Sequence, residues 1–329
     1  MDFYTYTKPY VERIEYKMNE ILSKEPKDVY GMFPEFLKAG GKRVRPTLAI
    51  LCCKAVGGEA EEVIEPASLV ELFHNFTLIH DDIEDDSKFR RGKPALHISY
   101  GIPIALNSGD ALYTLIWNKL LQLKLPQEKL LYINRICASG FKAVVEGQGM
   151  ELAWYKNERF DISEEEYIQM INGKTAALMS LCCELGAYIG GADKITIQKL
   201  RNFGQYIGAA FQIHDDVLNI TGTFEKYQKE IGGDISEGKR TLMIVHAMKH
   251  ASLEEREYII KALNSHSKKE EETIKKVIAI LKKYRSLEYA SGTANELIKK
   301  AKAELECIND SKDKKALLSI CDFVIRRDS

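Results

Sequence analysis

Two clusters of aspartates in the sequence could bind a divalent metal ion. The segment HDDIEDD carries Asp81, Asp82 and Asp85, and the segment QIHDDVLN carries Asp215 and Asp216, each after an apolar run. Because positions i and i+4 of a helix share one face, Asp81 and Asp85 can present carboxylates to the same ion, while Asp82 points partly aside. Such oxygen ligands suit Mg²⁺, which takes one or two carboxylates and completes its shell with water and substrate phosphates. The clusters therefore predict two acidic helices that hold a diphosphate through bridging metal ions.

A single acidic helix end is more often a solvated surface than a metal site. The presence of a second acidic cluster therefore strengthens the prediction of a metal site. Five acidic residues crowd into positions 81–86, where they repel one another near the negative end of the helix dipole. A bound cation is the simplest way to offset that cost.

Basic residues in the sequence could bind the phosphate oxygens of the same substrates. Arginine binds phosphate oxygens through a planar fork of donors, and lysine binds them as a point charge. Taken singly, each basic residue could be an ordinary surface charge, but beside two acidic clusters the set describes a site for two polyanions. The sequence has no GxxxxGK[ST] segment, so nucleotide hydrolysis is not indicated. The basic residues are Lys42, Arg43, Arg45, Arg90, Arg91, Lys93, Lys239 and Arg240.

Helices are expected to position these groups. Apolar residues recur at helical spacing along most of the chain, and alternating strand-like runs are rare. Ser163 and Glu166 have the spacing of a capping box, which predicts a helix start near Glu164. Three prolines fall at or near other expected helix starts, namely Pro46, Pro103 and Pro126. The sequence predicts an all-α fold with about ten to fourteen helices.

The composition excludes several classes of protein. The 329 residues are 45% hydrophobic and 29% charged with a net charge of -1, which argues against disorder and against a nucleic-acid binder with a basic face. No Pro/Gly/Ser-rich linker and no repeat marks a boundary, so a single domain over residues 1–329 is expected.

The sequence also predicts a cytoplasmic protein without a membrane anchor. The first residues are polar and charged, unlike a secretory signal. The most apolar long stretch, 175–192, is interrupted by Glu184 and several glycines, which favours a buried helix over a membrane span. The 7 cysteines lie in apolar stretches without CxxC spacing, as expected of reduced core residues.

Seven segments, in chain order, resemble motifs of the trans-prenyltransferases, the polyprenyl diphosphate synthases of the isoprenoid synthase fold. The segments are GGKRVRP, DDIEDDSKFRRGKPALH, GDALYT, GQGMEL, GKTAAL, FQIHDDVLNITG and GGDISEGKRTL. The resemblance covers most of the chain. It implies a single large helical bundle with a central substrate cavity.

The resemblance also implies a reaction. The family joins an allylic diphosphate to isopentenyl diphosphate head to tail, and about two or three Mg²⁺ ions help the allylic diphosphate to leave. An allylic carbocation forms, no protein nucleophile is needed, and the released diphosphate is the expected base for the final proton. Metal ions and cationic side chains stabilise the departing charge most in the transition state.

Site residues follow from the same resemblance. It implies that Asp81, Asp85 and Asp215 are metal ligands, with Asp82 and Asp216 supporting the metal site. The allylic diphosphate is expected to contact Arg90, Lys174 and Lys239. Isopentenyl diphosphate is expected to contact Lys42, Arg45, His74 and Arg91. Thr175 and Gln212 would place oxygen dipoles near the carbocation and so act with Lys174 and Lys239 in catalysis.

Two departures from the family pattern stand out. Asn219 ends the second acidic motif where many relatives carry a third aspartate, and an amide cannot give a metal the full charge of a carboxylate. The segment TFEKYQKEIGGD lacks the usual Gly-Lys-Pro turn, so either Lys226 or Lys229 could replace the family lysine.

Product length depends on the residues before the first acidic motif. Phe76 precedes Asp81 by five residues, so it lies about 7–8 Å deeper along a helix. In the family a bulky aromatic residue there acts as the floor of the hydrocarbon pocket, and with only two residues between the paired aspartates and Asp85 the pattern resembles archaeal geranylgeranyl diphosphate synthases. Thr77 is small, where farnesyl synthases of the eukaryotic type have another aromatic residue. Phe73 is either a second floor or part of the core. We expect a C20 product, geranylgeranyl diphosphate, with C15 farnesyl diphosphate as the alternative.

Other functions share parts of this pattern. A terpene cyclase or a head-to-head synthase would not need the second basic set of Lys42, Arg45 and Arg91. A catalytically idle partner subunit of a prenyl synthase would be expected to have lost an aspartate cluster. The family resemblance further suggests a homodimer, with the apolar helices near residues 102–122 and 128–145 as the contact.

Overall fold

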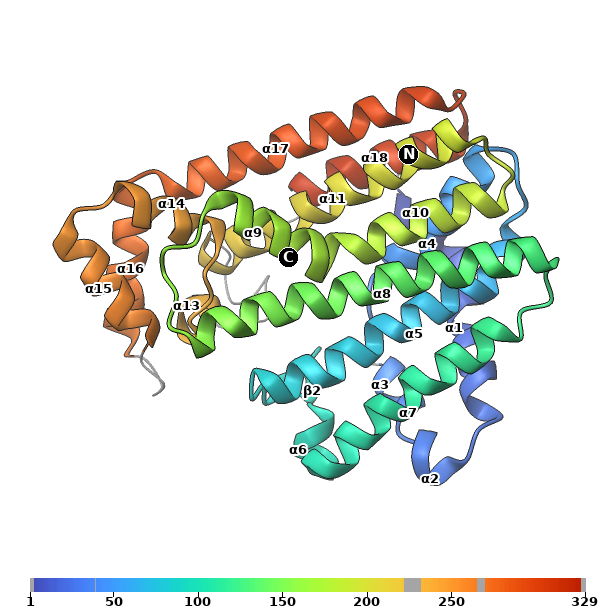
Figure 1. Cartoon of the computed structure of the whole chain (residues 1–329), viewed down its shortest axis with the longest axis horizontal. Helices are drawn as coiled ribbons and strands as arrows, with labels where there is room; N and C mark the ends of the chain where they lie inside the picture. Colours follow the sequence, from blue (N-terminus) through green and yellow to red (C-terminus); the bar gives the residue numbers. More distant parts are fainter. Residues whose placement is uncertain (1–2, 39, 222–231, 265–269, 327–329) are drawn as a thin grey trace. The chain divides into compact units, whose positions relative to one another are not determined.

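The chain folds almost entirely into helices. The computed structural model describes residues 3–38, 40–221, 232–264 and 270–326 (Figure 1). Within these ranges the strands are confined to one short antiparallel hairpin, in which Phe89 pairs with Pro94 and Arg90 pairs with Lys93. The predicted all-α class is confirmed.

The elements follow one another along the chain in the order of their labels. The first part contains α1 (Phe3–Ser23), α2 (Lys27–Tyr30), α3 (Phe33–Lys38), α4 (Val44–Ala55), α5 (Ala60–Glu84), β1 (Phe89–Arg90), β2 (Lys93–Pro94), α6 (Leu96–Tyr100) and α7 (Ile102–Leu121). The middle part contains α8 (Gln127–Lys156), α9 (Glu164–Ile171), the π-helix η1 (Asn172–Ala176), α10 (Ala177–Ile189) and α11 (Lys194–Thr221). The last part contains α13 (Gly233–Glu237), α14 (Leu242–His250), α15 (Leu253–Asn264), α16 (Glu271–Lys283), α17 (Ser286–Glu304), the 3₁₀-helix η2 (Leu305–Cys307) and α18 (Lys312–Arg326).

Short helices make the number larger than the sequence predicts. Over the described part of the chain, α2, α3, α6 and α13 have only four to six residues. Such elements span about one or two turns, too little for a recurring apolar pattern to be visible in the sequence.

The contacts divide the chain into two compact units. Unit 1 comprises residues 1–141, 178–204 and 305–319, and unit 2 comprises residues 142–177, 205–304 and 320–329. In unit 1, α5 packs against α1, α4 and α7 (Figure 1). In unit 2, α14 packs against α9, α15, α16 and α17. A single domain over the whole chain stays a prediction.

The start of α9 has the capping box that the sequence predicts. The backbone N–H of Glu166 donates to Ser163 Oγ over 3.1 Å, and the backbone N–H of Ser163 donates to Glu166 Oε2 over 2.9 Å. Two of the amide donors that a helix start leaves unpaired are thereby satisfied. The helix begins at Glu164, as expected.

A close backbone contact fixes the π-helix η1 against α8. A Cβ atom at Gly147 would lie 2.2 Å from the backbone nitrogen of Lys174, and one at Gly173 would lie 2.7 Å from the carbonyl oxygen of Ala143. Only glycine permits this approach. Since π-helical turns widen a helix locally, η1 sets the direction of Lys174 and Thr175.

The cysteines form no disulfide in the structure. All seven are free, and six of them are buried, with Cys307 half-buried. None of the described helices has both the length and the apolar content that a membrane span needs.

A buried ion pair stabilises unit 1 and provides a first prediction. Arg43 Nη1 lies 3.1 Å from Glu71 Oε1, and the two side chains are 1% and 3% exposed. Removing the carboxylate leaves the buried guanidinium with the more exposed Glu15 as its remaining carboxylate, 3.3 Å from Arg43 Nε, so Glu71→Ala should lower the free energy of unfolding by about 3 kcal/mol. Urea denaturation followed by circular dichroism measures the loss.

The control for this prediction is the solvent-exposed pair of Lys142 and Glu146. Because water screens exposed ion pairs, Glu146→Ala should change the unfolding midpoint far less than Glu71→Ala. Equal midpoints for the two variants would contradict a stabilising role for the buried pair.

Candidate active site

The first acidic cluster lies at the end of α5 in unit 1. Asp81 and Asp82 belong to its last turn, and the backbone N–H of Asp85 donates to the carbonyl oxygen of Asp81 over 2.9 Å. Asp81 and Asp85 are half-buried, whereas Asp82 is only 1% exposed. The three carboxylates therefore differ in accessibility, as the helical spacing predicts.

Asp82 holds the hairpin that carries the arginines. Arg90 Nε donates to Asp82 Oδ1 over 2.8 Å, and Arg90 Nη2 contacts the same oxygen. Burial raises the pKa of the Asp82 carboxyl, although Arg90 beside it favours the carboxylate. Its second oxygen, Oδ2, is buried without a hydrogen-bond partner in the described part of the protein. Asp82 thus orients Arg90, which fits the supporting role that we expect for it.

Three of the residues predicted to bind isopentenyl diphosphate, Arg45, His74 and Arg91, lie together in a positive region of unit 1. Burial, reinforced by Arg45 and Arg91, lowers the pKa of His74 well below its ordinary value. Burial, reinforced by Arg43, lowers the pKa of Arg91 to about 10. Arg91 also donates to the carbonyl oxygen of Gly40. His74 is therefore a neutral imidazole near pH 7, beside guanidinium groups that stay charged.

Two residues of this region have a strained backbone. Arg43 has φ 45° and Arg91 has φ 53°, both in the left-handed region. Such a conformation costs about 1–3 kcal/mol and persists only where the surrounding contacts enforce it. Lys42 precedes Arg43 and is exposed. The strain lies in the two segments, around Arg43 and Arg91, that carry the predicted phosphate-binding residues.

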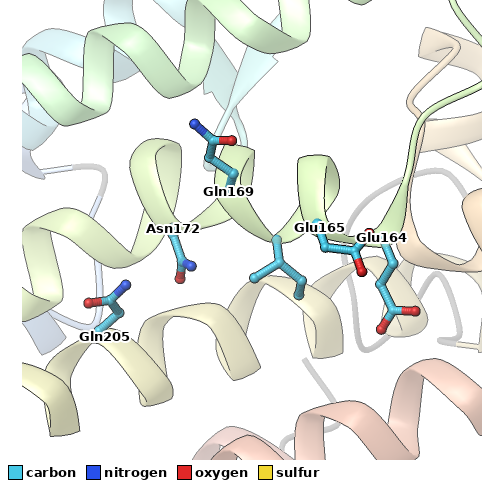
Figure 2. Close-up of a pocket in the computed structure, with 6 residues that line it drawn as sticks. Glu164, Glu165, Gln169, Asn172 and Gln205 are labelled. Carbon is cyan, nitrogen blue, oxygen red and sulfur yellow. The ribbon is translucent and has the colours of Figure 1, made fainter.

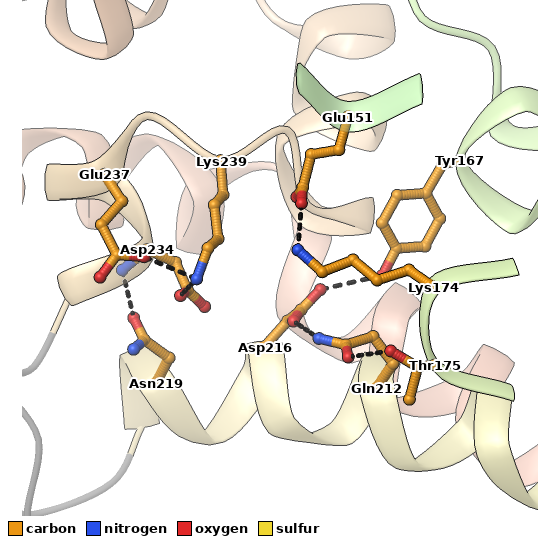
Figure 3. Close-up of polar contacts among 10 residues, drawn as sticks. All are labelled: Glu151, Tyr167, Lys174, Thr175, Gln212, Asp216, Asn219, Asp234, Glu237 and Lys239. Atoms are coloured by element: carbon orange, nitrogen blue, oxygen red, sulfur yellow. Dashed lines mark hydrogen bonds and ion pairs between the residues drawn. The ribbon is translucent and has the colours of Figure 1, made fainter. Parts of the chain in front are cut away.

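The second acidic cluster lies on α11 in unit 2. Asp216 is 6% exposed, and Asp215 is half-buried. Tyr167 Oη donates to Asp216 Oδ2 over 2.9 Å, and Gln212 Nε2 donates to Asp216 Oδ1 over 2.8 Å (Figure 3). Burial, and next the neighbouring Asp234, raise the pKa of Asp216 well above its ordinary value. Both oxygens of Asp216 have protein donors, which fits a supporting role.

The two residues predicted to face the carbocation are in contact. Thr175 Oγ1, on η1, donates to Gln212 Oε1, on α11, over 2.7 Å (Figure 3). The chain brings these side chains together from positions 37 residues apart. Their oxygens can act as one set of dipoles.

Both predicted lysines of unit 2 are held by carboxylates. Lys174 contacts Glu151, a residue of α8 that is 6% exposed (Figure 3). Burial alone would raise the pKa of Glu151, but Lys174 and Lys239 together lower it below the ordinary value. Lys239 Nζ lies 2.9 Å from Asp234 Oδ1 and 2.6 Å from Glu237 Oε2. These contacts limit the positions that the two ammonium groups can take.

Asn219 has a structural contact where many relatives carry an aspartate. Its Oδ1 accepts the backbone N–H of Asp234 over 3.1 Å, and its carbonyl oxygen accepts the backbone N–H of Gly232 over 2.8 Å (Figure 3). The side chain is 3% exposed. Asn219 thus positions the segment that carries Asp234. Lys226 and Lys229 lie outside the described residues.

Three further residues of this network are not assigned a role from the sequence. Glu151 lies within GQGMEL, so a carboxylate inside a recognised motif could have indicated it. Asp234 likewise lies within GGDISEGKRTL. Tyr167 has no comparable signal, since it is one residue of the buried face of α9.

The phenylalanines near the first acidic cluster have different surroundings. Phe73 is fully buried, and its ring stacks on that of Phe141 with centroids 3.7 Å apart. Phe76 is half-buried, with its ring 5.2 Å from Tyr113 and 4.7 Å from His80. Thr77 Oγ1 donates to the carbonyl oxygen of His74 over 2.8 Å. Phe73 therefore belongs to the core, and Phe76 is the better candidate for a floor.

A recess of about 540 Å³ in unit 2 is less suited to a diphosphate. Figure 2 shows its polar lining on α9, η1 and α11. The carboxylates of Glu164 and Glu165 would repel an anion, and no cationic side chain lines the recess. None of the predicted site residues belongs to it. The lining residues are Glu164, Glu165, Ile168, Gln169, Asn172 and Gln205.

The donor set of the acidic clusters suits Mg²⁺. Asp81, Asp85 and Asp215 offer half-buried carboxylates, the hard oxygen ligands that this ion prefers. Among the residues that the structure describes, no three His, Cys, Asp or Glu side chains are grouped so as to hold an ion by themselves. Carboxylates of this kind fit an ion that completes its shell with water and substrate phosphates.

Comparisons with known proteins agree with this chemistry. The polyprenyl synthetase family model matches residues 26–281. A short chain isoprenyl diphosphate synthase from Methanothermobacter thermautotrophicus is 38% identical over 96% of this chain and 95% of that protein. A geranylgeranyl pyrophosphate synthase from Geoglobus acetivorans is 35% identical over 95% of each chain.

A solved structure supports the same assignment. The crystal structure of a geranylgeranyl pyrophosphate synthetase from Pyrococcus horikoshii has a TM-score of 0.92 and 32% identity, and the match covers 99% of this chain and 98% of that one. The chain therefore belongs to the polyprenyl synthetase family, has the helical fold of the isoprenoid synthases and is a prenyltransferase.

Proposed function

We propose that the protein condenses isopentenyl diphosphate with an allylic diphosphate head to tail. The observation that carries the proposal is the separation of charge within unit 1. Half-buried carboxylates end α5, whereas Arg45, His74 and Arg91 form a region whose nearby carboxylate, Glu71, is neutralised by Arg43. A metal-dependent site and a metal-free cationic site can distinguish two diphosphates, so that only one of them ionises.

The allylic diphosphate is assigned to the acidic clusters. Asp81, Asp85 and Asp215 would hold Mg²⁺, about two or three ions, which assist the departure of the diphosphate when bound. Asp82 and Asp216 support this site through their hydrogen bonds to Arg90 and Gln212. Arg90, Lys174 and Lys239 neutralise charge that develops on the leaving oxygens, which lowers the barrier because this charge is largest in the transition state.

The remaining residues control the second half of the reaction. Lys42, Arg45, His74 and Arg91 hold isopentenyl diphosphate without ionising it. Thr175 and Gln212 direct oxygen atoms toward the carbocation. The allylic C–O bond breaks, a new C–C bond forms, and the released diphosphate accepts the proton that restores the double bond.

We assign a C20 product, geranylgeranyl diphosphate. The half-buried ring of Phe76, which packs against the ring of Tyr113, supports a floor at this depth. The relatives from Geoglobus acetivorans and Pyrococcus horikoshii are both named for a geranylgeranyl product. A C15 product is the alternative.

The active enzyme is proposed to be a cytoplasmic homodimer whose residues 1–329 work as one catalytic domain. Exposed apolar side chains support a contact through α6 and α7, and gel filtration with light scattering measures the mass. The seven free cysteines suit a reducing compartment. The exposed side chains are Ile98, Ile102, Ile104 and Leu106.

One incubation tests the function. Purified protein is mixed with dimethylallyl diphosphate, labelled isopentenyl diphosphate and Mg²⁺, and the products are dephosphorylated and separated by chromatography. A labelled C20 alcohol that disappears on addition of EDTA is expected. A C15 or longer alcohol would keep the reaction but overturn the floor assignment. Absence of elongation with every allylic starter would favour the idle partner subunit.

A further inference from the structure

A buried tyrosine belongs to the hydrogen-bond network of unit 2. Tyr167 is 1% exposed, and its hydroxyl donates to Asp216 Oδ2 over 2.9 Å (Figure 3). The ring comes from the buried face of α9, seven residues before Lys174. Tyr167 is thus linked to Gln212 through Asp216, by two successive hydrogen bonds.

The hydrogen bonds to Asp216 give the chain from Tyr167 to Thr175 a direction. Tyr167 Oη and Gln212 Nε2 both donate to Asp216, and each of its two oxygens accepts one of these bonds. Because Nε2 of the Gln212 amide faces Asp216, its Oε1 must face Thr175. The Thr175 hydroxyl therefore donates its single hydrogen to Gln212 Oε1.

This polarity determines what the network can offer to a cation. With the Thr175 hydrogen and one Gln212 N–H donated inside the network, Thr175 Oγ1 and Gln212 Oε1 keep lone pairs for a positive charge. If the Gln212 amide were inverted, its N–H groups would face Thr175 and repel a developing cation. Correct amide orientation is thus a condition for electrostatic stabilisation.

We propose that Tyr167 is a positioning residue that fixes the orientation of the Gln212 amide and the Thr175 hydroxyl through Asp216. This inference rests on the proposed function. Without the tyrosine donor, Asp216 Oδ2 is buried with no partner, and the carboxylate turns to recover a second donor. The acceptor that orients the Gln212 amide, Asp216 Oδ1, is then no longer held in place.

Tyr167→Phe removes the hydroxyl and keeps the ring. We expect kcat to fall about tenfold, the loss that corresponds to one hydrogen bond to a charged group. KM for both diphosphates and the Mg²⁺ concentration at half-maximal rate should stay at their wild-type values. Steady-state kinetics with both substrates measures these quantities, and a thermal melt monitors folding.

The matched control is Tyr132→Phe. Tyr132 Oη donates to Glu184 Oε1 over 2.9 Å in unit 1, so this variant also removes a tyrosine–carboxylate hydrogen bond. Its kcat should equal that of the wild type. A wild-type kcat in Tyr167→Phe as well would overturn the inference.

A double variant separates positioning from general damage. In a Gln212→Met background, Tyr167→Phe should cause no further loss of kcat, because the amide through which it acts is absent. If the double variant instead lost the product of the two single-variant factors in kcat, Tyr167 would act independently of Gln212, and the inference would be overturned. A wild-type protein that fails to elongate any starter overturns the proposed function itself, together with this inference.

A second variant covers the case in which Tyr167→Phe does not fold. Asp216→Asn keeps the shape of the side chain, and its amide oxygen can take the position of Asp216 Oδ2 and accept from Tyr167. The new amide N–H₂ then faces Gln212 and inverts its amide, so kcat should fall about tenfold. A wild-type kcat in Asp216→Asn would contradict the positioning role.

Discussion

Asp81→Ala is expected to abolish elongation while leaving the binding of isopentenyl diphosphate close to that of the wild type. The variant removes a half-buried carboxylate from the end of α5, where Asp85 is its partner one turn on. Metal assistance to the departing diphosphate contributes several kcal/mol, so kcat should fall by about 10³-fold or more. Steady-state elongation assays measure kcat, and calorimetric titration with isopentenyl diphosphate measures its dissociation constant.

Asp86→Ala is the control for this experiment. Asp86 belongs to the same acidic segment, but it is exposed and pairs with Lys88 over 2.7 Å. Its removal should leave kcat unchanged. If Asp81→Ala weakened the binding of isopentenyl diphosphate as strongly as it slowed elongation, the first acidic cluster would have been assigned to the wrong diphosphate.

Phe76→Ala should lengthen the product by one or more isoprene units. The ring of Phe76 is half-buried and lies against Tyr113 and His80, so its removal opens space for a longer hydrocarbon chain. The catalytic groups are unchanged, and elongation therefore continues beyond C20. Chromatography of the dephosphorylated alcohols measures the distribution.

Phe73→Ala is the comparison. Phe73 is fully buried and stacked on Phe141, so its truncation creates a core cavity and should cost about 3–5 kcal/mol of unfolding free energy. Its product should stay at the wild-type length. An unchanged product in Phe76→Ala, or a longer product in Phe73→Ala, would show that the floor lies elsewhere.

Local patterns in the sequence account for much of this structure. Helical periodicity predicts the α class, and the pair Ser163 and Glu166 predicts the start of α9 to the residue. These features depend on residues within about one turn of each other, so their physics is contained in short segments. The spacing of Asp81, Asp82 and Asp85 likewise predicts that Asp82 lies apart from the other two.

Long-range hydrogen bonds could not be predicted in this way. Tyr167 and Asp216 are 49 positions apart, and Glu151 and Lys174 are 23 apart. No periodic pattern encodes such pairs, because they depend on how helices pack and on which polar atoms would otherwise be buried alone. The sequence therefore indicated Thr175 and Gln212 as oxygen dipoles but not the tyrosine that fixes their polarity.

The glycine contact between α8 and η1 has a consequence for protein engineering. Gly147 and Gly173 leave no space for even a methyl group between the two backbones. Any side chain introduced there would push η1 outward and carry Lys174 and Thr175 with it. Libraries that aim to diversify the product should therefore leave both glycines fixed and vary Phe76 and its neighbour Tyr113, whose rings pack 5.2 Å apart.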